Sequence, residues 1–441
     1  MNELGDGVKR GLEETVVDIL SLSSSNRRPF PALQGYSSAE WERCLTWMDD
    51  TGLALYFLHA IEQTTDAVPE FVIQRLRNKR HANEERTSYM QRQFEFINRG
   101  FENIGIRYSA VKGLTLEPTF CPDVSLRHQS DFDYLTDLEG LYRGSLLLQE
   151  MGYVLHKESD HERIFVHPDN QGPKRGDAQY AASAAHSVEL HLTIGHFPHL
   201  AWKEPVFLEN AVTRRFHGST FQGLSDADSF ILQALHSFHH LLGGWLKLSW
   251  LYEIAHFLDT RAPDTDLCQT ISKKLSADPL LREAVAVIVS LASQLFQVQL
   301  PASIENWITE IRPAVRIWIE KYARVWTFGP NRIDEFEWFP TSKLVLFLHQ
   351  QYVPDRRDWR GIALARLLAL NGLKRISRSA ISKRPSKEKS GTRLSAREFR
   401  RIAFHLGSDL RYMWEVPRWW HWTRTCPPNG SSLKGSSSPA A

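Results

Sequence analysis

The sequence predicts an α+β protein in which a small mixed-sheet core lies between two helical regions. Three observations carry this prediction: helical spacing of apolar residues from about 38 to 104, short alternating segments between 105 and 222, and renewed helical spacing after Leu224. A chain of 441 residues is long enough for two or three domains. We expect an N-terminal helical region, an α/β core, a second helical region and a basic, Trp-containing C-terminal segment with a disordered tail, at 1–100, 101–222, 223–373 and 374–441.

Composition narrows the class of protein. The apolar and charged fractions, 42% and 24%, are those of an ordinary water-soluble protein, and a net charge of +2 predicts no overall attraction to nucleic acid. The four cysteines show no paired or metal-ligand spacing, which fits a reducing cytosol. The first residues, "MNELGDGVKRGLEE", lack a basic start followed by an apolar run, so we expect no signal peptide and a cytoplasmic location.

The N-terminal region has the spacing of amphipathic helices. The stretch "AEWERCLTWMDDTGLALYFLHAI" places five apolar residues near one helical face, and "RNKRHANEERTSYMQRQFEFINRGFENIG" repeats the pattern with a charged outer side. Pro69 marks the break between them. The five apolar residues are Trp41, Cys44, Leu45, Met48 and Leu53.

The middle of the chain changes to strand-like patterns. "GIRYSAVKG" at 105–113 has the β-branched, alternating character of a strand that ends at a glycine, and "DFDYLTDLEG" predicts a second strand that leads into a helix over 137–151. Further strands are predicted at "GYVLH", "ERIFVHP", "HSVELHLTI" and "TRRFHG".

Helical spacing returns after this core. Residues 226–259 predict two helices broken at Gly243 and Gly244, and the apolar window at 284–296 is too short to cross a bilayer, so it predicts a buried helix. Between Lys374 and Arg401 the chain has eleven basic and two acidic residues. We interpret this run as a solvated surface, and expect the tryptophans that follow it to pack a C-terminal helix onto the body of the protein, namely Trp414, Trp419, Trp420 and Trp422.

The candidate chemistry lies in "RHQSDFDY" and "SVELHLT". Residues two apart share one face of a strand, so Asp131 and Asp133 face one way while Phe132 and Tyr134 pack on the other side. The same alternation in the second segment sends Val188, Leu190 and Leu192 to the core and puts Glu189, His191 and Thr193 on the opposite face.

Three carboxylates brought together from these strands would need a cation. Asp131, Asp133 and Glu189 would raise one another's pKa unless a metal ion neutralised them. Mg²⁺, or Mn²⁺, suits such hard oxygen ligands, and two such ions roughly 3.5–4 Å apart can assist phosphoryl-type transfer. Each motif taken singly has a plainer explanation, because a D-x-D pair is often a solvated turn and an alternating Glu-x-His is often an exposed sheet face.

The order of the motifs resembles a known family. "YSAVKGLTL", "SLRHQSDFDYL", a later Gly-Tyr and then "VELHL" are similar to the uncharacterised nucleotidyltransferases of the polymerase-β-like superfamily, over residues from about 40 to 260. The resemblance implies a nucleotidyltransferase-like core and transfer of a nucleoside monophosphate from an NTP to an acceptor, with release of pyrophosphate. It also assigns the catalytic, metal-holding residues as Asp131, Asp133 and Glu189.

The resemblance implies nucleotide contacts as well. Gly113 would allow close approach of a phosphate, Lys112 would meet the triphosphate as a point charge, and Arg127 would either bind phosphate or brace the carboxylates. His191, His239 and Lys247 complete the expected nucleotide-binding set. The chain has Lys112-Gly113-Leu114 where the wider superfamily has Gly-Ser or Gly-Gly, and a longer gap before Asp131, so a hydroxyl contact to phosphate is missing.

Two other functions stay open. One is a nucleotidyltransferase-like scaffold that binds without turnover, and the other a D-x-D glycosyltransferase, for which the helical residues upstream leave no room for a βαβ nucleotide-sugar domain. The acceptor could be a small molecule, a peptide in a natural-product pathway, a protein or an RNA. We expect no membrane partner and do not favour nucleic acid.

Overall fold

The computed structural model describes residues 11–22, 33–62, 68–168, 176–184, 186–193, 200, 207–261, 263–328, 343–367 and 396–425. The chain divides into two compact units. The first comprises Met1–His196, Trp202–His239 and Leu246–Ile308, and the second Phe197–Ala201, His240–Trp245 and Thr309–Ala441. The predicted boundaries at 100, 222 and 373 stay predictions.

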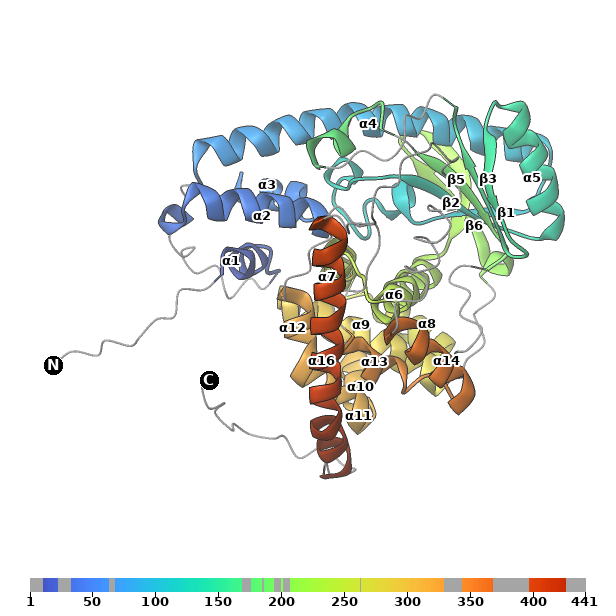
Figure 1. Ribbon diagram of the computed structural model, residues 1–441. Coiled ribbons are helices and arrows are strands. Elements are labelled where there is room, and N and C mark those ends of the chain that lie inside the picture. The colour runs from blue at the N-terminus through green and yellow to red at the C-terminus, as the bar shows by residue number, and fades with distance from the viewer. Residues whose placement is uncertain are drawn as a thin grey trace, which may run out of the picture. The chain divides into compact units, whose positions relative to one another are not determined.

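The first unit is a mixed sheet flanked by helices, which confirms the predicted α+β class (Figure 1). Its helices, of which α6 and α10 end in segments assigned to the second unit, are α1 Leu12–Ile19, α2 Ser38–Thr51, α3 Ala54–Ile61, α4 Glu70–Asn103, α5 Leu138–Glu150, α6 Asp226–Gly243, α7 Leu248–Arg261, α8 Thr265–Leu275, α9 Pro279–Phe296 and α10 Ala302–Thr309. The strands are β1 Tyr108–Val111, β2 Asp131–Thr136, β3 Val154–Glu158, β4 Glu162–Val166, β5 Ser187–His191, β6 Ala211–Phe216 and β7 Ser219–Leu224.

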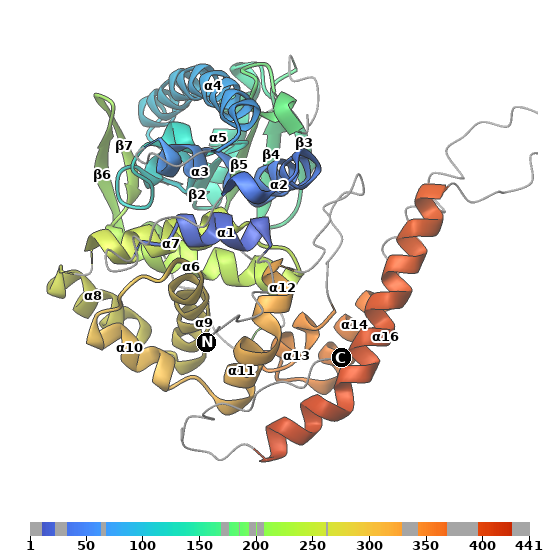
Figure 2. The same cartoon turned by 90° about the vertical axis from the view of Figure 1, so that its left-hand side faces the viewer.

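The seven strands lie in the order β3-β4-β5-β2-β1-β7-β6. The pairs β2–β5 and β1–β7 are parallel, and the other pairs are antiparallel. The helices α4 and α5 cover one side of the sheet, and α6 and α7 lie on the other side in both views (Figures 1 and 2). The sheet therefore separates two helical layers.

The core lies between the sheet and the layer of α4 and α5. Phe94 and Phe101 of α4 and Leu148 of α5 pack against inward-facing strand residues in one hydrophobic cluster. The predicted alternation is confirmed, since this cluster contains Phe132, Tyr134, Val188 and Leu190. Their polar neighbours in the sequence consequently lie on the opposite face of the sheet.

The N-terminal helices follow the predicted pattern with an additional break. All five predicted apolar residues are buried, and α4 begins directly after Pro69. The first predicted helical stretch is divided, because α2 ends at Gly52 in a left-handed conformation, φ 76°. A side chain at Gly52 would also collide with Ser249, since an added Cβ would lie 2.5 Å from Oγ. Both facts favour glycine here.

The predicted buried helix is α9. It is the one described helix whose length and composition would allow a membrane span, and 67% of that window is buried inside the protein. Twelve of its residues are buried. The break at Gly243 and Gly244 is confirmed as well, because α6 ends at Gly243 and α7 begins at Leu248.

The second unit is helical in its described part. It contains α11 Pro313–Trp318, the π-helical turn η7 Ile319–Ala323, α12 Arg324–Phe328, α13 Val345–His349, α14 Arg356–Leu367 and α16 Ala396–Thr425. The indole of Trp318 is fully buried and donates a hydrogen bond to the Leu344 carbonyl at 3.0 Å. The basic run before residue 396 and the predicted disordered tail after 425 lie outside the described residues.

The C-terminal helix is confirmed, but the packing predicted for its tryptophans is only partly right. Trp419 is buried, whereas Trp414 and Trp420 are 69% and 53% exposed, so the prediction that they pack inward is wrong. The physical reason is geometric, because tryptophans that lie almost all around one helix cannot all meet a single neighbouring surface.

Candidate functional site

Strands β2 and β5 bring two predicted carboxylates together. The strands pair in parallel with Asp133 opposite Glu189 and with Asp131 opposite Ser187. The amide of Ser187 also donates to the Ser130 carbonyl at 3.0 Å, which extends the pairing beyond the start of β2. Asp131, Asp133, Glu189 and His191 therefore share one face of two adjacent strands.

The side chains of Asp133, Glu189 and His191 form a compact donor cluster. Nε2 of His191 lies 3.1 Å from Oδ1 of Asp133 and 3.4 Å from Oε2 of Glu189, and one ligand atom of each residue lies within 4.8 Å of the others. Carboxylate oxygens and a histidine nitrogen are common metal ligands, so this cluster could hold a metal ion. His191, predicted as a nucleotide contact, is thus part of the donor set itself.

Lys112 enters the same cluster from the end of β1. Its Nζ lies 3.0 Å from Oδ1 of Asp133, and its backbone has the left-handed angle φ 58°. Such a conformation costs on the order of 1–3 kcal/mol in a residue that has a side chain, and residues that adopt it are concentrated at functional sites. The lysine of the Lys-Gly motif therefore contacts a carboxylate directly.

Gly113 is where the chain needs a residue without a side chain. It has φ 51°, and an added Cβ would lie 2.0 Å from the side-chain nitrogen Nε2 of Gln129. The close approach found here is by the Gln129 side chain, and the expected approach of a phosphate stays a prediction.

Arg127 links the site to α7. Its Nε lies 2.9 Å from Oε1 of Glu253, and a second nitrogen donates to Oε1 of Gln129 at 2.9 Å. Gln129 in turn donates to the backbone carbonyl of Asp131, and Tyr56 donates to Oε1 of Glu253 at 3.3 Å. Arg127 is thus linked to the backbone of Asp131 through Gln129, and the two roles that the resemblance left open for it stay predictions.

The long helix α4 holds the segment that leads into β2. Arg86 is 1% exposed and donates through Nε and a terminal nitrogen to the Gln129 carbonyl, at 3.0 and 2.8 Å. Its other terminal nitrogen donates to the Ala184 carbonyl at 2.7 Å, in the segment before β5. Asn83 donates to the Ser125 carbonyl at 2.6 Å. One buried arginine therefore joins the approaches to both site strands.

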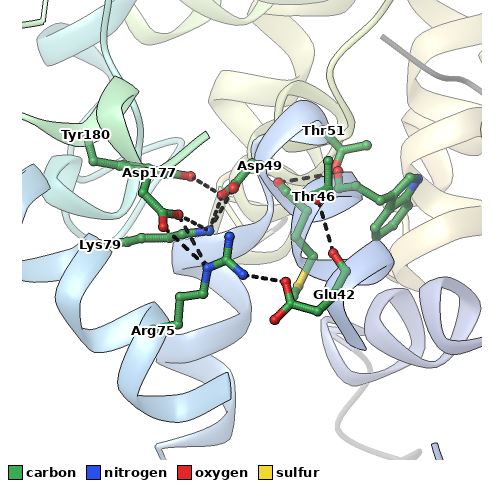
Figure 3. A network of polar contacts seen from close by, with 10 residues as sticks. Glu42, Thr46, Asp49, Thr51, Arg75, Lys79, Asp177 and Tyr180 are labelled. Atoms are coloured by element: carbon green, nitrogen blue, oxygen red, sulfur yellow. Dashed lines mark hydrogen bonds and ion pairs between the residues drawn. The ribbon is translucent and has the colours of Figure 1, made fainter. Parts of the chain in front are cut away.

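A second polar network fixes the short helix η5 (Gly176–Tyr180) between α2 and α4 (Figure 3). Lys79 and Asp49 form a buried ion pair at 2.7 Å, and the Tyr180 hydroxyl donates to Asp49 at 2.9 Å. Asp177 lies 3.2 Å from Lys79. The carbonyl of Gln179 in the same helix lies 3.0 Å from Nε2 of His128, so this network supports the segment just before Gln129.

Electrostatics separate the two aspartates of the D-x-D motif. Burial, together with the negative charges of Asp133 and Glu189, raises the pKa of Asp131. Burial acts in the same direction on Asp133, but Lys112 and His191 outweigh it and lower the pKa of Asp133. Against the effect of its own burial, the hydrogen bonds to Asp133 and Glu189 raise the pKa of His191 to about 9. Three acidic groups thus concentrate negative charge where the protein supplies two cationic partners.

The remaining predicted residues lie on α6 and just before α7. His239 is buried on α6, and burial lowers its pKa to about 3, so it is neutral at pH 7. Lys247 is half-buried, and burial together with the nearby charge of Arg127 lowers its pKa, while Asp131 and Glu253 act in the opposite direction. Lys247 is therefore electrostatically coupled to the site, and no described contact joins His239 to the Asp133 carboxylate.

Sequence analysis missed several contributors. Arg86, Asn83 and Glu253 lie outside the motifs used above, and Gln129 lies within "RHQSDFDY" but was given no role. A buried charged or amide residue on the apolar face of a helix was the available signal, because such groups need specific partners. Arg86 and Asn83 occupy such positions on α4.

The fold and the site together define an α+β protein whose carboxylate–histidine cluster could hold a metal ion. The chain belongs to a family of uncharacterised nucleotidyltransferases, whose model matches residues 37–297. This match spans well over half of the chain and includes every predicted site residue. No curated protein sequence matches the chain.

Proposed function

We propose that the protein is a metal-dependent nucleotidyltransferase that moves a nucleoside monophosphate from an NTP to an acceptor. The observation that carries the proposal is the register of β2 and β5, which sets Asp133 beside Glu189 within a cluster able to hold a metal ion. Family membership supports nucleotidyl transfer as the type of reaction.

The donor set fits a divalent cation. Asp133 and Glu189 would hold Mg²⁺ or Mn²⁺, with His191 adjoining, because clustered carboxylates provide the hard oxygen ligands that these ions require. Asp131, on the same face of β2 but outside this cluster, would contribute the third carboxylate. The rise in the pKa of Asp131 caused partly by its acidic neighbours is the mark of negative charge that a cation would relieve. When bound, such an ion supplies charge neutralisation for the phosphates and activation of the attacking oxygen.

The residues of the chain would then divide the remaining tasks. Lys112 and Lys247 supply positive charge for the triphosphate, Gly113 and His239 are proposed nucleotide contacts, and Arg127 braces the site through Gln129. The acceptor oxygen bonds to the α-phosphorus, the bond to the bridging oxygen of the β-phosphate breaks, and pyrophosphate leaves with the electron pair. Glu189 would accept the proton of the acceptor.

Substitution at Asp133 tests the proposal. The purified protein is incubated with each α-labelled NTP, Mg²⁺ and cell extract, and label transferred to an acceptor is measured together with released pyrophosphate. We expect Asp133→Asn to lower transfer by a factor on the order of 10²–10⁴, as for the loss of a group that acts on the reacting atoms.

Asp137→Asn is the matched control, because Asp137 follows the same strand but caps α5 and asparagine caps equally well. This control should transfer label at the unaltered rate. Full activity in Asp133→Asn, with an unchanged circular dichroism spectrum, would show that the carboxylate cluster is not the catalytic centre.

A scaffold that binds without turnover is the second candidate. The observation that favours it is that both Lys112 and His191 contact Oδ1 of Asp133, so the protein itself supplies positive charge at this carboxylate. Calorimetry with an NTP separates the two functions, because the scaffold binds equally well with and without Mg²⁺ and transfers no label. A D-x-D glycosyltransferase, which would release a nucleoside diphosphate, gains no support from the family match.

The acceptor, the cellular location and the pathway are further parts of the proposal. A small molecule, a peptide of a natural-product pathway, a protein or an RNA end each offers a nucleophilic oxygen. A cytoplasmic location accords with NTP as the donor. Fractionation of the labelled extract by size and by nuclease or protease sensitivity would assign the acceptor class.

A further inference from the structure

Helix α16 carries a stripe of large apolar side chains that the described part of its own unit leaves exposed. The side chains of this stripe are more than half exposed, between 53% and 69%. At about 100° per residue, their positions fall on one helical arc of about 120°. The stripe consists of Leu406, Leu410, Met413, Trp414 and Trp420.

The opposite face of α16 accounts for its packing. Tyr412 and Trp419 stack on Phe347 of α13, with ring centroids at 4.7 and 4.9 Å. Tyr322 donates a hydrogen bond to Glu415 at 3.1 Å. The helix is therefore anchored in its unit through one face, and the exposed stripe is an additional feature that the packing does not require.

The charges around the stripe are positive. The guanidinium of Arg418 lies over the ring of Trp414 at 5.3 Å, and that of Arg424 lies over Trp420 at 4.8 Å. The two acidic side chains described on the helix are both paired, Asp409 with Lys343 and Glu415 with Arg418. The sequence from Lys374 to Arg401, just before and within the start of this helix, adds eleven basic and two acidic residues.

We infer that the exposed stripe of α16 docks the protein on an anionic lipid surface. A helix that lies in a membrane interface presents an apolar arc to the acyl boundary and basic residues to the headgroups. Tryptophan and arginine suit that position, since each combines an apolar body with a polar end. This proposal departs from the sequence-based expectation of no membrane partner.

Charge complementarity favours lipid over the other occupants. Two copies of the stripe would bring Arg424 against Arg424, and among the described residues of the arc no acidic group would pair with it. A nucleic acid would satisfy the arginines but would leave Leu406, Leu410 and Met413 without an apolar partner. An anionic bilayer satisfies both sets of side chains at once.

Vesicle flotation of the full chain tests the inference. The protein is mixed with vesicles of pure phosphatidylcholine, or of equal parts phosphatidylcholine and phosphatidylglycerol, and the bound fraction is measured at low and high salt. We expect binding to the anionic vesicles, weakened by salt, with little binding to the neutral ones.

Leu410→Glu should lower the apparent affinity for anionic vesicles about tenfold or more, because it places a charge in the middle of the apolar arc. Leu138→Glu is the matched control, since Leu138 is 71% exposed on α5 and its substitution changes the net charge equally. The control should bind as the unaltered chain does, and both variants should keep the unaltered thermal stability.

Three results would overturn the inference. One is absence of binding to anionic vesicles, and another is an equal loss in the two variants. The third is a dimer in sedimentation velocity, or a complex with RNA, that Leu410→Glu abolishes while vesicle binding is absent. Nucleotidyl transfer does not enter any of these readouts, so the test is independent of the proposed function.

Discussion

Arg86 shows how a single buried side chain can set the geometry of a site that it does not touch. Its guanidinium binds the carbonyls of Gln129 and Ala184, which precede the two strands that carry Asp133 and Glu189. Burial lowers the pKa of Arg86 to about 10, so the group stays charged at pH 7. Its fixed fork of donors cannot be reproduced by a shorter or apolar side chain.

Substitution of Arg86 is therefore expected to weaken metal binding. Arg86→Met leaves two buried carbonyls without their donor, which should cost about 2–4 kcal/mol in unfolding free energy and lower Mn²⁺ affinity about 10–100-fold. The affinity is measured by electron paramagnetic resonance at a temperature where the variant is folded.

Arg92→Met serves as the control, because Arg92 is exposed on the same helix. It should change neither quantity. A stable Arg86→Met protein with unaltered Mn²⁺ affinity would assign Arg86 to folding alone.

For single residues, the sequence predicted the direction in which a side chain points better than it predicted which residues that side chain contacts. Alternation in two strands was enough to place Asp131, Asp133 and Glu189 on one face, because side-chain direction in a strand follows from position. The contact of Arg86 with Gln129 could not be predicted, since it joins residues 43 positions apart through a helix–loop packing arrangement that no local pattern encodes.

Ion pairs join neighbouring helices, and these pairs differ in how much they stabilise the folded protein. Lys79 of α4 and Asp49 of α2 are almost inaccessible to solvent, and the Tyr180 hydroxyl donates a hydrogen bond to Asp49 (Figure 3). Arg80, the next residue along the helix, pairs with Glu62 at a similar distance, 2.6 Å, but both side chains are about one-third exposed. Solvent screens the second pair and leaves the first unscreened.

Two neighbouring substitutions can compare these pairs. Lys79→Met strands the buried carboxylate of Asp49 and is expected to lower the unfolding free energy by about 3–5 kcal/mol. Arg80→Met should lower it by less than about 1 kcal/mol. Urea unfolding monitored by circular dichroism gives both values. Equal losses of unfolding free energy would contradict the conclusion that the Lys79–Asp49 pair is the more stabilising of the two.

Helices could be predicted where the helical spacing of apolar residues continued over several turns. The helices of α2 to α5, α6, α7 and α9 have apolar residues at regular spacing, which a single sequence reveals. Strand β7 was missed because "STFQGL" has no clean alternation, and its pairing with β1 comes from residues far upstream. The break at Gly52 was missed because apolar spacing runs straight through it.

The whole molecule consists of two units, and each unit has buried aromatic residues of its own. The family match at 37–297 ends before the second unit's main segment begins at Thr309. Trp318 and Trp419 are buried in that second unit, while the carboxylate cluster belongs to the first. Division of the chain in this way was not evident from the sequence, since helical spacing continues across the boundary near residue 308.

Loss of Trp419 should therefore affect one unit more than the other. Trp419→Ala removes a ring stacked on Phe347 and should cost the second unit about 3–5 kcal/mol. Trp420→Ala, at an exposed position, should cost less than about 0.5 kcal/mol. Thermal unfolding followed by near-ultraviolet circular dichroism measures the loss, and Mn²⁺ binding should persist in both variants. If Trp419→Ala also lost Mn²⁺ binding, the stability of the first unit would depend on that of the second.

The interior strand β1 has a consequence for synthesis of the protein on the ribosome. In the parallel pair of β1 and β7, Ala110 lies opposite Gly223. One edge of β1 therefore stays unpaired until more than a hundred later residues have been translated. An unpaired strand edge is a template for association with other nascent chains. Cells that make this protein quickly should therefore depend on a chaperone that shields β1 until β7 has emerged.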